Sequence, residues 1–139
     1  MPVSQPRNRR DSRDRVGPHE KVFTMKEMID EIFALSTDVR YVALYEDGVL
    51  VSRERPGVAH PSGAESDRYE ELLVNPTLLT LAGQRGAIDC GGLRFLVVRY
   101  GSFFQLVRPL PGGHLSVAVE PTGDPLAIAA ALERRLAGR

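Results

Sequence analysis

The sequence predicts an α+β domain in which helices pack on the faces of a five-stranded antiparallel sheet, with the elements in the order α-β-β-α-β-β-β-α. Three observations predict this fold class. Apolar residues recur at helical spacing in three separate stretches. The stretches between them are short and either apolar or alternating, as in strands. The connections between neighbouring strands are short and glycine-rich, which favours antiparallel pairing.

Residues 1–22 are predicted to be a flexible charged tail, followed by one domain at residues 23–139. Arginine and aspartate dominate the tail, prolines interrupt it, and apolar residues are almost absent. Such a segment buries too little apolar surface to offset the entropy lost on ordering. The alternative role is a weak electrostatic arm for an anionic surface, which the aspartates oppose.

The ordered part is predicted to begin with a helix at residues 24–36. Thr24 and Glu27 have the spacing of a capping box. Apolar residues then recur every three or four positions, so one face of this helix is expected to be buried.

A β-hairpin is predicted next, with strands at residues 41–45 and 49–53. Asp47-Gly48 lies between them and is a strong signal for a tight hairpin turn. The proline- and glycine-rich residues 55–63 are expected to form a loop.

A second helical region is predicted at residues 66–84. Asn75-Pro76 interrupts it, because proline has no N–H and restricts the residue before it. Asn75 can cap a restarted helix with Pro76 at its first position, so a kinked helix or two abutting helices are expected. Residues 86–92 are expected to extend the next strand or to form a small edge hairpin.

Three strands and a final helix complete the domain. The strands are predicted at residues 93–100, 103–108 and 114–120, and their short links favour an antiparallel meander. Asp124-Pro125 should start the last helix, because aspartate is a good N-cap and proline suits the first helical position.

The composition excludes several classes of function. Lys and Arg number 18 and Asp and Glu also number 18, so the chain lacks the basic surplus of a dedicated nucleic-acid binder. No apolar run approaches the length of a membrane span. Cys90 is the one cysteine, which rules out an internal disulfide and a cysteine-based zinc site. We therefore expect a cytoplasmic protein without metal or cofactor, in which Cys90 is half-buried and structural.

No constellation of residues predicts catalysis. The histidines are scattered and lack the spacing of metal ligands. His60, Ser62 and Asp67 are the residue types of a triad, but no nucleophile-elbow pattern surrounds the serine. The chain is therefore predicted not to be an enzyme.

The order and lengths of these elements resemble the roadblock / dynein light chain family over about residues 24–136. The segments VRYVALYEDGVLVSRERPG and LRFLVVRYGSFFQLVRPLPGGHLSVAVEPTGDPLAIAAALERRL carry the resemblance. It implies a non-catalytic homodimer or heterodimer, joined through the second helix and the third strand into one continuous sheet. It also implies a platform or regulator for Ras-like small GTPases, or an adaptor subunit of a larger assembly.

The residues themselves also favour self-association. The third strand is apolar on both faces and is expected at a sheet edge, where it needs a covering partner. A symmetric copy is one such partner, and internal packing in a monomer is the other. The predicted dimer-interface residues are Leu72, Leu73, Leu78, Leu79, Phe95 and Val97. The predicted surface for a second partner is the exposed side of the helix pair, with Arg68, Glu71 and Asn75.

A different function is compatible with the same pattern, because profilin-like sensor domains share parts of it. Such a domain would hold a small molecule between sheet and helices, with Tyr41, Tyr45 and Phe104 as lining residues. An enclosed cavity with converging polar groups would favour this alternative, whereas a filled core would count against it.

Overall fold

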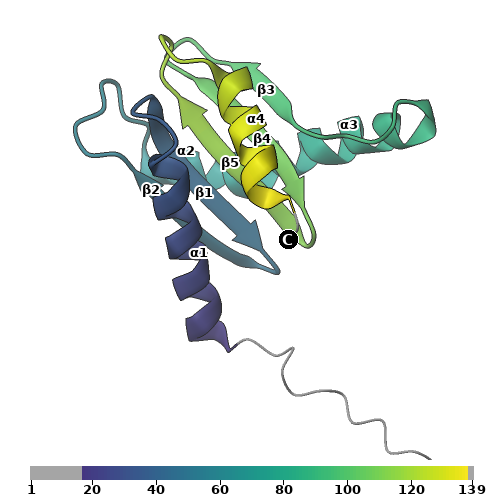
Figure 1. Cartoon of the computed structure of the whole chain (residues 1–139), viewed down its shortest axis with the longest axis horizontal. Coiled ribbons are helices and arrows are strands. Elements are labelled where there is room, and N and C mark those ends of the chain that lie inside the picture. Colours follow the sequence, from purple (N-terminus) through teal and green to yellow (C-terminus); the bar gives the residue numbers. More distant parts are fainter. Residues whose placement is uncertain (1–16, 138–139) are drawn as a thin grey trace, which may run out of the picture.

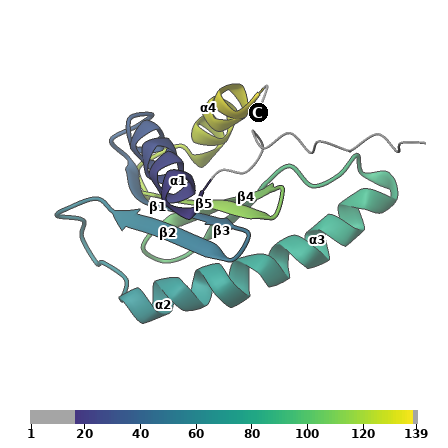
Figure 2. The same ribbon diagram turned by 90° about the horizontal axis from the view of Figure 1, so that it is seen from below.

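The computed structural model describes residues 17–137 and has three layers (Figures 1 and 2). Helices α1 and α4 cover one face of the sheet, which we call the dry face. One long helical run, made of α2, η2 and α3, crosses the opposite face, which we call the polar face, and α3 projects beyond the sheet (Figure 1). The helical elements are α1 (Pro18–Phe33), α2 (Ala64–Tyr69), the π-helical turn η2 (Glu70–Val74), α3 (Asn75–Asp89) and α4 (Pro125–Leu136).

The sheet is five-stranded and antiparallel, in the order β2-β1-β5-β4-β3, so the predicted fold class is confirmed. The last three strands form the predicted meander, and the third strand lies at an edge as expected. The strands are β1 (Val39–Glu46), β2 (Val49–Glu54), β3 (Leu96–Arg99), β4 (Phe104–Leu110) and β5 (Gly113–Val119).

Local signals in the sequence place the first hairpin and the last helix correctly. Asp47 and Gly48 both take positive φ angles, 49° and 83°, which a two-residue turn of this twist requires. The Asp124 side chain accepts hydrogen bonds from the backbone N–H groups of Leu126 and Ala127, so it caps α4 as predicted.

The first helix begins earlier than its capping-box signal suggested. It starts at Pro18, which occupies the first helical turn where its missing N–H is not needed. Thr24 therefore lies inside the helix, and its hydroxyl donates to the Glu20 carbonyl instead of capping. Residues 18–22 were expected in the tail but belong to α1, and residues 1–16 lie outside the described part of the chain.

The second helical region is continuous from α2 through α3, so the prediction of a restart at Asn75 is wrong. The backbone at Asn75 is helical, and its N–H donates to the Glu70 carbonyl five residues back. This wide π-helical turn directly precedes Pro76, the residue that cannot donate a hydrogen bond of its own. The run continues because the backbone widens before the proline instead of breaking at it.

The helix also runs further than predicted, so residues 86–92 neither extend a strand nor form an edge hairpin. Gly86 lies inside α3, where an added Cβ would sit 3.0 Å from the backbone nitrogen of Leu93. Gly91 and Gly92 have positive φ angles and turn the chain back over Gly86. As a result β3 is shorter than the expected strand at residues 93–100.

Candidate functional site

Buried polar side chains meet on the polar face, beneath the π-helical turn. Glu71 and Asn75 are both 0% exposed and point from the helical run towards the sheet. The Glu71 carboxylate lies 2.6 Å from Nε2 of His114 and accepts hydrogen bonds from Asn75 Nδ2 at 3.1 Å and the Tyr41 hydroxyl at 3.4 Å. Because a buried carboxylate is stable only when its partners satisfy it, this constellation holds the helical run in register on the sheet.

The same constellation continues onto the middle strands of the sheet. Asn75 Nδ2 lies 3.5 Å from the Ser116 hydroxyl, which also accepts a hydrogen bond from Gln105 Nε2. No described residue donates to Asn75 Oδ1. We call these residues the polar cluster: Tyr41, Glu71, Asn75, Gln105, His114 and Ser116.

Glu71 and Asn75 were expected on the exposed side of the helix pair, and that expectation is wrong. A helical pattern counted at a constant period does not allow for the wider π-helical turn between α2 and α3. With the wider turn, both polar side chains face the sheet. Arg68, the third residue of that prediction, is exposed and lines a neighbouring groove.

The solvent side of the helical run carries a stripe of large apolar side chains among polar ones. Tyr69, Leu73, Leu81 and Ile88 are between 56% and 76% exposed. A shallow groove of about 390 Å³ follows the first part of this stripe and includes Leu78. Large apolar side chains that line up on one exposed helix face are typical of an interaction surface.

The predicted interface residues divide into two groups. Leu73 and Val97 are exposed, Leu73 on the helical run and Val97 on the edge strand β3. The half-buried group contains Leu72, Leu78, Leu79 and Phe95, of which Phe95 packs against the core of the dry face. Tyr69, Leu81 and Ile88 were not among the predicted interface residues, although the helical spacing of Tyr69 and Leu81 with the predicted leucines was a usable signal.

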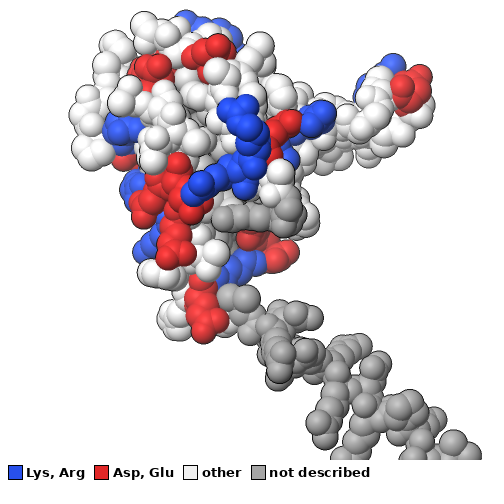
Figure 3. Space-filling model, viewed as in Figure 1, with Lys and Arg blue, Asp and Glu red and all other residues white. Residues whose placement is uncertain are grey.

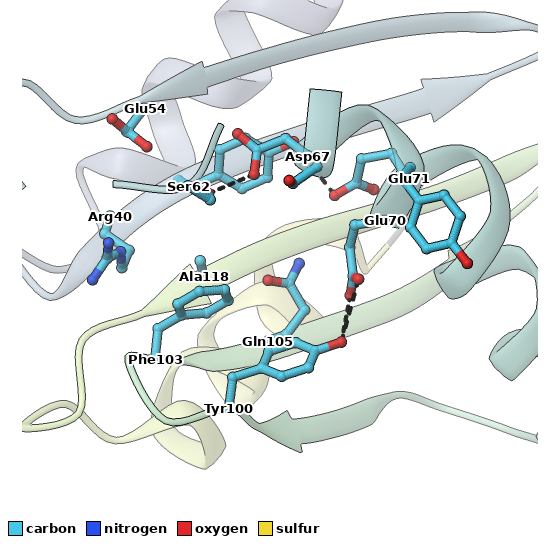
Figure 4. A pocket seen from close by; sticks show the side chains of 13 residues that line it. Arg40, Glu54, Ser62, Asp67, Glu70, Glu71, Tyr100, Phe103, Gln105 and Ala118 are labelled. Carbon is cyan, nitrogen blue, oxygen red and sulfur yellow. Dashed lines mark hydrogen bonds between the residues drawn. The ribbon is translucent and has the colours of Figure 1, made fainter. Parts of the chain in front are cut away.

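A cavity of about 320 Å³ opens between α2, η2 and the sheet (Figure 4). Aromatic rings and carboxylates make up most of its wall. The Tyr100 hydroxyl donates to both oxygens of Glu70, at 3.0 and 3.2 Å, and the Ser62 hydroxyl donates to Asp67 at 2.5 Å. The lining includes Arg40, Tyr41, Glu54, Asp67, Tyr69, Glu70, Glu71, Tyr100, Phe103 and Gln105.

The environment of the cavity perturbs several ionisable groups. Burial raises the pKa of Tyr100 to about 12, with the carboxylate of Glu70 adding to the effect. Burial, followed by the charges of Glu71 and Asp67, likewise raises the pKa of Tyr41. Burial also raises the pKa of Glu70 above its usual value, although the Tyr100 hydrogen bond opposes this. Both tyrosines therefore stay protonated at neutral pH and act as hydrogen-bond donors.

The cavity matches part of the ligand-sensing alternative. Tyr41 lines it as expected, but Tyr45 stacks against His114 with ring centroids 5.7 Å apart, and Phe104 packs against the core of the dry face. Ser62 bonds to Asp67 without His60 among its partners, so this trio does not form a triad in the described structure.

Cys90 is exposed at the end of α3, so the prediction of a half-buried cysteine is wrong. Across residues 17–137, no group of three His, Cys, Asp or Glu side chains could hold a metal ion. None of the helices in that range is long and apolar enough to cross a bilayer.

The surface over α1 and α4 carries charges of both signs close together (Figure 3). Several are paired, as in Arg94 with Glu133 at 2.6 Å and Arg135 with Glu31 at 2.9 Å. This face therefore lacks the broad single-sign field that attracts a nucleic acid.

Solved structures share this fold at low sequence identity. A structure described as "MglB with tetrameric arrangement" is 13% identical, with a TM-score of 0.62 over 81% of this chain and 82% of that chain. The gliding protein MglB from Thermus thermophilus is 16% identical, with a TM-score of 0.57 over 80% of this chain and 81% of that chain. MglC from Myxococcus xanthus is 13% identical, with a TM-score of 0.51 over 81% of this chain and 92% of that chain.

These neighbours are roadblock/longin-like proteins, so the chain has a roadblock-like fold and the resemblance seen in the sequence holds at that level. No family model matches the sequence, and no curated protein matches it significantly.

Proposed function

We propose that this protein is a non-catalytic interaction module that forms a homodimer and regulates or scaffolds a small Ras-like GTPase or a related assembly. The observation that carries the proposal is the apolar, solvent-exposed stripe on the helical run, together with the free edge of β3. An exposed apolar edge strand is an aggregation hazard unless a partner covers it. The roadblock-like fold offers a symmetric copy as that partner.

Three further points support the proposal. α3 projects past the sheet, so its exposed residues Leu81 and Ile88 have no part of their own sheet to cover them (Figure 1). One neighbour in fold, MglB, is described as having a tetrameric arrangement, so self-association is recorded for this architecture. The GTPase part rests on the roadblock resemblance, and exposed Arg68 is the residue we assign to a partner's surface.

The first test is the solution mass measured by light scattering over a range of concentrations. We expect a mass near twice 15.3 kDa. Val97→Asp places a charge on the edge strand and should give a monomer. Leu126→Asp is the matched control, because Leu126 is a 62% exposed leucine on α4, away from the proposed interface. A monomeric parent protein would overturn the homodimer, and equal behaviour of the two variants would overturn the placing of its interface at the edge of β3.

The GTPase part needs its own test. Small Ras-like GTPases from the same organism, loaded with GDP or with a non-hydrolysable GTP analogue, can be immobilised and probed with the dimer. We expect binding that depends on the nucleotide and that Arg68→Glu weakens. Absence of binding to every GTPase in both states would leave an interaction module with another partner.

A second candidate function is ligand sensing, and the cavity beneath α2 is the observation that favours it. Pockets that bind small molecules are concave, largely apolar and carry a few convergent polar groups. The chemistry of this cavity is specific enough to name a class of ligand.

A further inference from the structure

The cavity beneath α2 contains a side-chain acceptor that is open to a ligand. Gln105 is 2% exposed, and its side chain extends from β4 into the cavity (Figure 4). Its amide nitrogen donates to Ser116, whereas no described residue donates to its amide oxygen. An amide oxygen that faces an open cavity accepts a hydrogen bond from water or from a ligand there. The ligand group that replaces the water is therefore a hydrogen-bond donor.

Carboxylates surround the same space. Glu54, Asp67 and Glu70 line the cavity, and no residue of the described chain pairs with Glu54. Asp67 uses one oxygen for Ser62, which leaves its second oxygen available. The raised pKa of Glu70 has the charges of Asp67 and Glu71 among its causes, which shows how closely the acids are placed. Neighbouring carboxylates of this kind favour a cation between them.

The walls of the cavity are aromatic. Tyr100 and Phe103 form a tilted pair with ring centroids 5.4 Å apart, and Tyr69 stands exposed at the other side. Aromatic ring faces attract cations, and they do so more strongly for organic cations that lose water easily. A flat or alkyl-substituted cation therefore fits this wall better than a hydrated metal ion.

Arg40 is the one cationic side chain in the wall, and its hydrogen bonds are already made. Its guanidinium donates to the carbonyls of Ala59 and His60 at 2.9 and 3.0 Å. It also contacts the carboxylate of Glu120 at 3.4 Å and stacks over the ring of Phe103 at 5.2 Å. Its charge is matched outside the cavity, so it does not neutralise the acids that line the cavity and does not offer free donors to an anion.

We infer that this cavity binds an alkylguanidinium or alkylammonium group, whose N–H groups reach the Gln105 amide oxygen and the carboxylates of Asp67 and Glu70. The inference goes beyond the proposed function, since it concerns a ligand of the cavity, which shares only Tyr69 with the exposed apolar stripe. The ligand is a free organic cation or the tip of a basic side chain, and the two share the same recognition chemistry.

The test uses butylguanidinium as the probe and butylurea as its neutral counterpart of the same shape. Chemical shifts of the full-length protein are followed by NMR during each titration. We expect saturable binding of butylguanidinium with a dissociation constant of about 1 mM or tighter. We expect no saturable change with butylurea, because it brings fewer donors and no charge to the carboxylates.

Variants connect the binding to the cavity. Glu70→Gln and Asp67→Asn keep the shape and an acceptor but remove a charge, so each should weaken binding about tenfold. Tyr69→Ala removes an exposed wall and should weaken binding without harming the fold. Glu27→Gln is the control with the same change in net charge, since Glu27 is exposed on α1 over the dry face.

The outcomes separate the two sources and the two proposals. Binding of a short arginine peptide with the same dependence on Glu70 assigns the cavity to a partner's side chain, and binding of butylguanidinium alone assigns it to a free organic cation. No saturable binding of either probe, or binding that Glu70→Gln leaves unchanged, would overturn the inference. The mass of the Glu70→Gln variant by light scattering reports on the dimer separately, and we expect it to equal that of the parent.

Discussion

The two faces of the sheet are built on opposite principles. The dry face, under α1 and α4, is apolar throughout and closely filled, with Ile29, Leu44, Leu115 and Leu132 at 0–1% exposure. The polar face has only a small apolar cluster around Tyr41, next to buried polar side chains and an open cavity. Apolar side chains on that side are exposed on the far surface of the helical run instead.

The difference arises residue by residue along the same strands. In β5, Leu115 and Val117 belong to the core of the dry face. His114 and Ser116 alternate with them along the strand and belong to the polar cluster. Successive side chains of a strand point to opposite faces, so one strand serves both. The dry face therefore stabilises the domain. The polar face positions the helical run, and it leaves the outer surface of that run and the cavity beneath it available for binding.

The largest expected effect comes from removing the carboxylate at the centre of the polar cluster. Glu71→Ala leaves His114, Asn75 and Tyr41 without their shared acceptor, so it should lower the free energy of unfolding by about 3–5 kcal/mol. Chemical denaturation measures this, with Glu65→Ala on exposed α2 as the control. A change near zero in the free energy of unfolding would mean that the polar cluster does not hold the helical run on the sheet. It would contradict the role assigned here to the polar face.

Truncation on the dry face should have a similar or slightly smaller effect through a different mechanism. Leu115→Ala deletes buried methyl groups at a 0% exposed position and leaves a cavity, which costs about 2–5 kcal/mol. Leu126→Ala changes the same side chain where it is 62% exposed and should alter stability by about 0.5 kcal/mol or less. Thermal or urea unfolding of the pair tests whether the dry face is the apolar core.

The smallest effect should come from the cavity rim, and it should depend on pH. The pKa of Glu70 is raised in the folded chain, so its contribution to stability is complete below the ordinary value of 4.5 and is lost as pH rises through the raised value. Glu70→Gln has no carboxylate to ionise, so the variant does not lose this stability as the pH rises. At neutral pH the variant should therefore be slightly more stable than the parent, by about 0.5 kcal/mol or less.

The control for this effect is Glu65→Gln, which makes the same change of charge at an exposed position of α2. Melting curves at acid and neutral pH give the comparison. Equal stability of parent and Glu70→Gln at both pH values would show that the ionised Glu70 carboxylate does not destabilise the fold. A parent that is more stable than the variant at neutral pH would show that the ionised carboxylate stabilises the fold, which contradicts the prediction.

Local signals in the sequence were sufficient for most of the fold. The Asp47-Gly48 turn, the Asp124 cap and the short glycine-rich links led to the correct hairpin, final helix and meander, because each depends on the conformational preferences of a few adjacent residues. The edge position of the third strand also followed from connection lengths. These features are local in the chain, so the chain by itself determines them.

Only the tertiary structure decided what the second helical region does. Asn75-Pro76 is compatible with a break, a kink or a π-helical turn, and the packing of Glu71 and Asn75 against the sheet goes with the π-helical turn. The cavity brings together residues that lie far apart in the sequence, such as Tyr41 of β1 and Gln105 of β4, which no spacing rule connects. Whether a polar side chain is buried depends on the hydrogen-bond partners that other elements bring to it. Sequence periodicity indicates which face of an element a residue occupies, but it does not identify the residues that pack against that face.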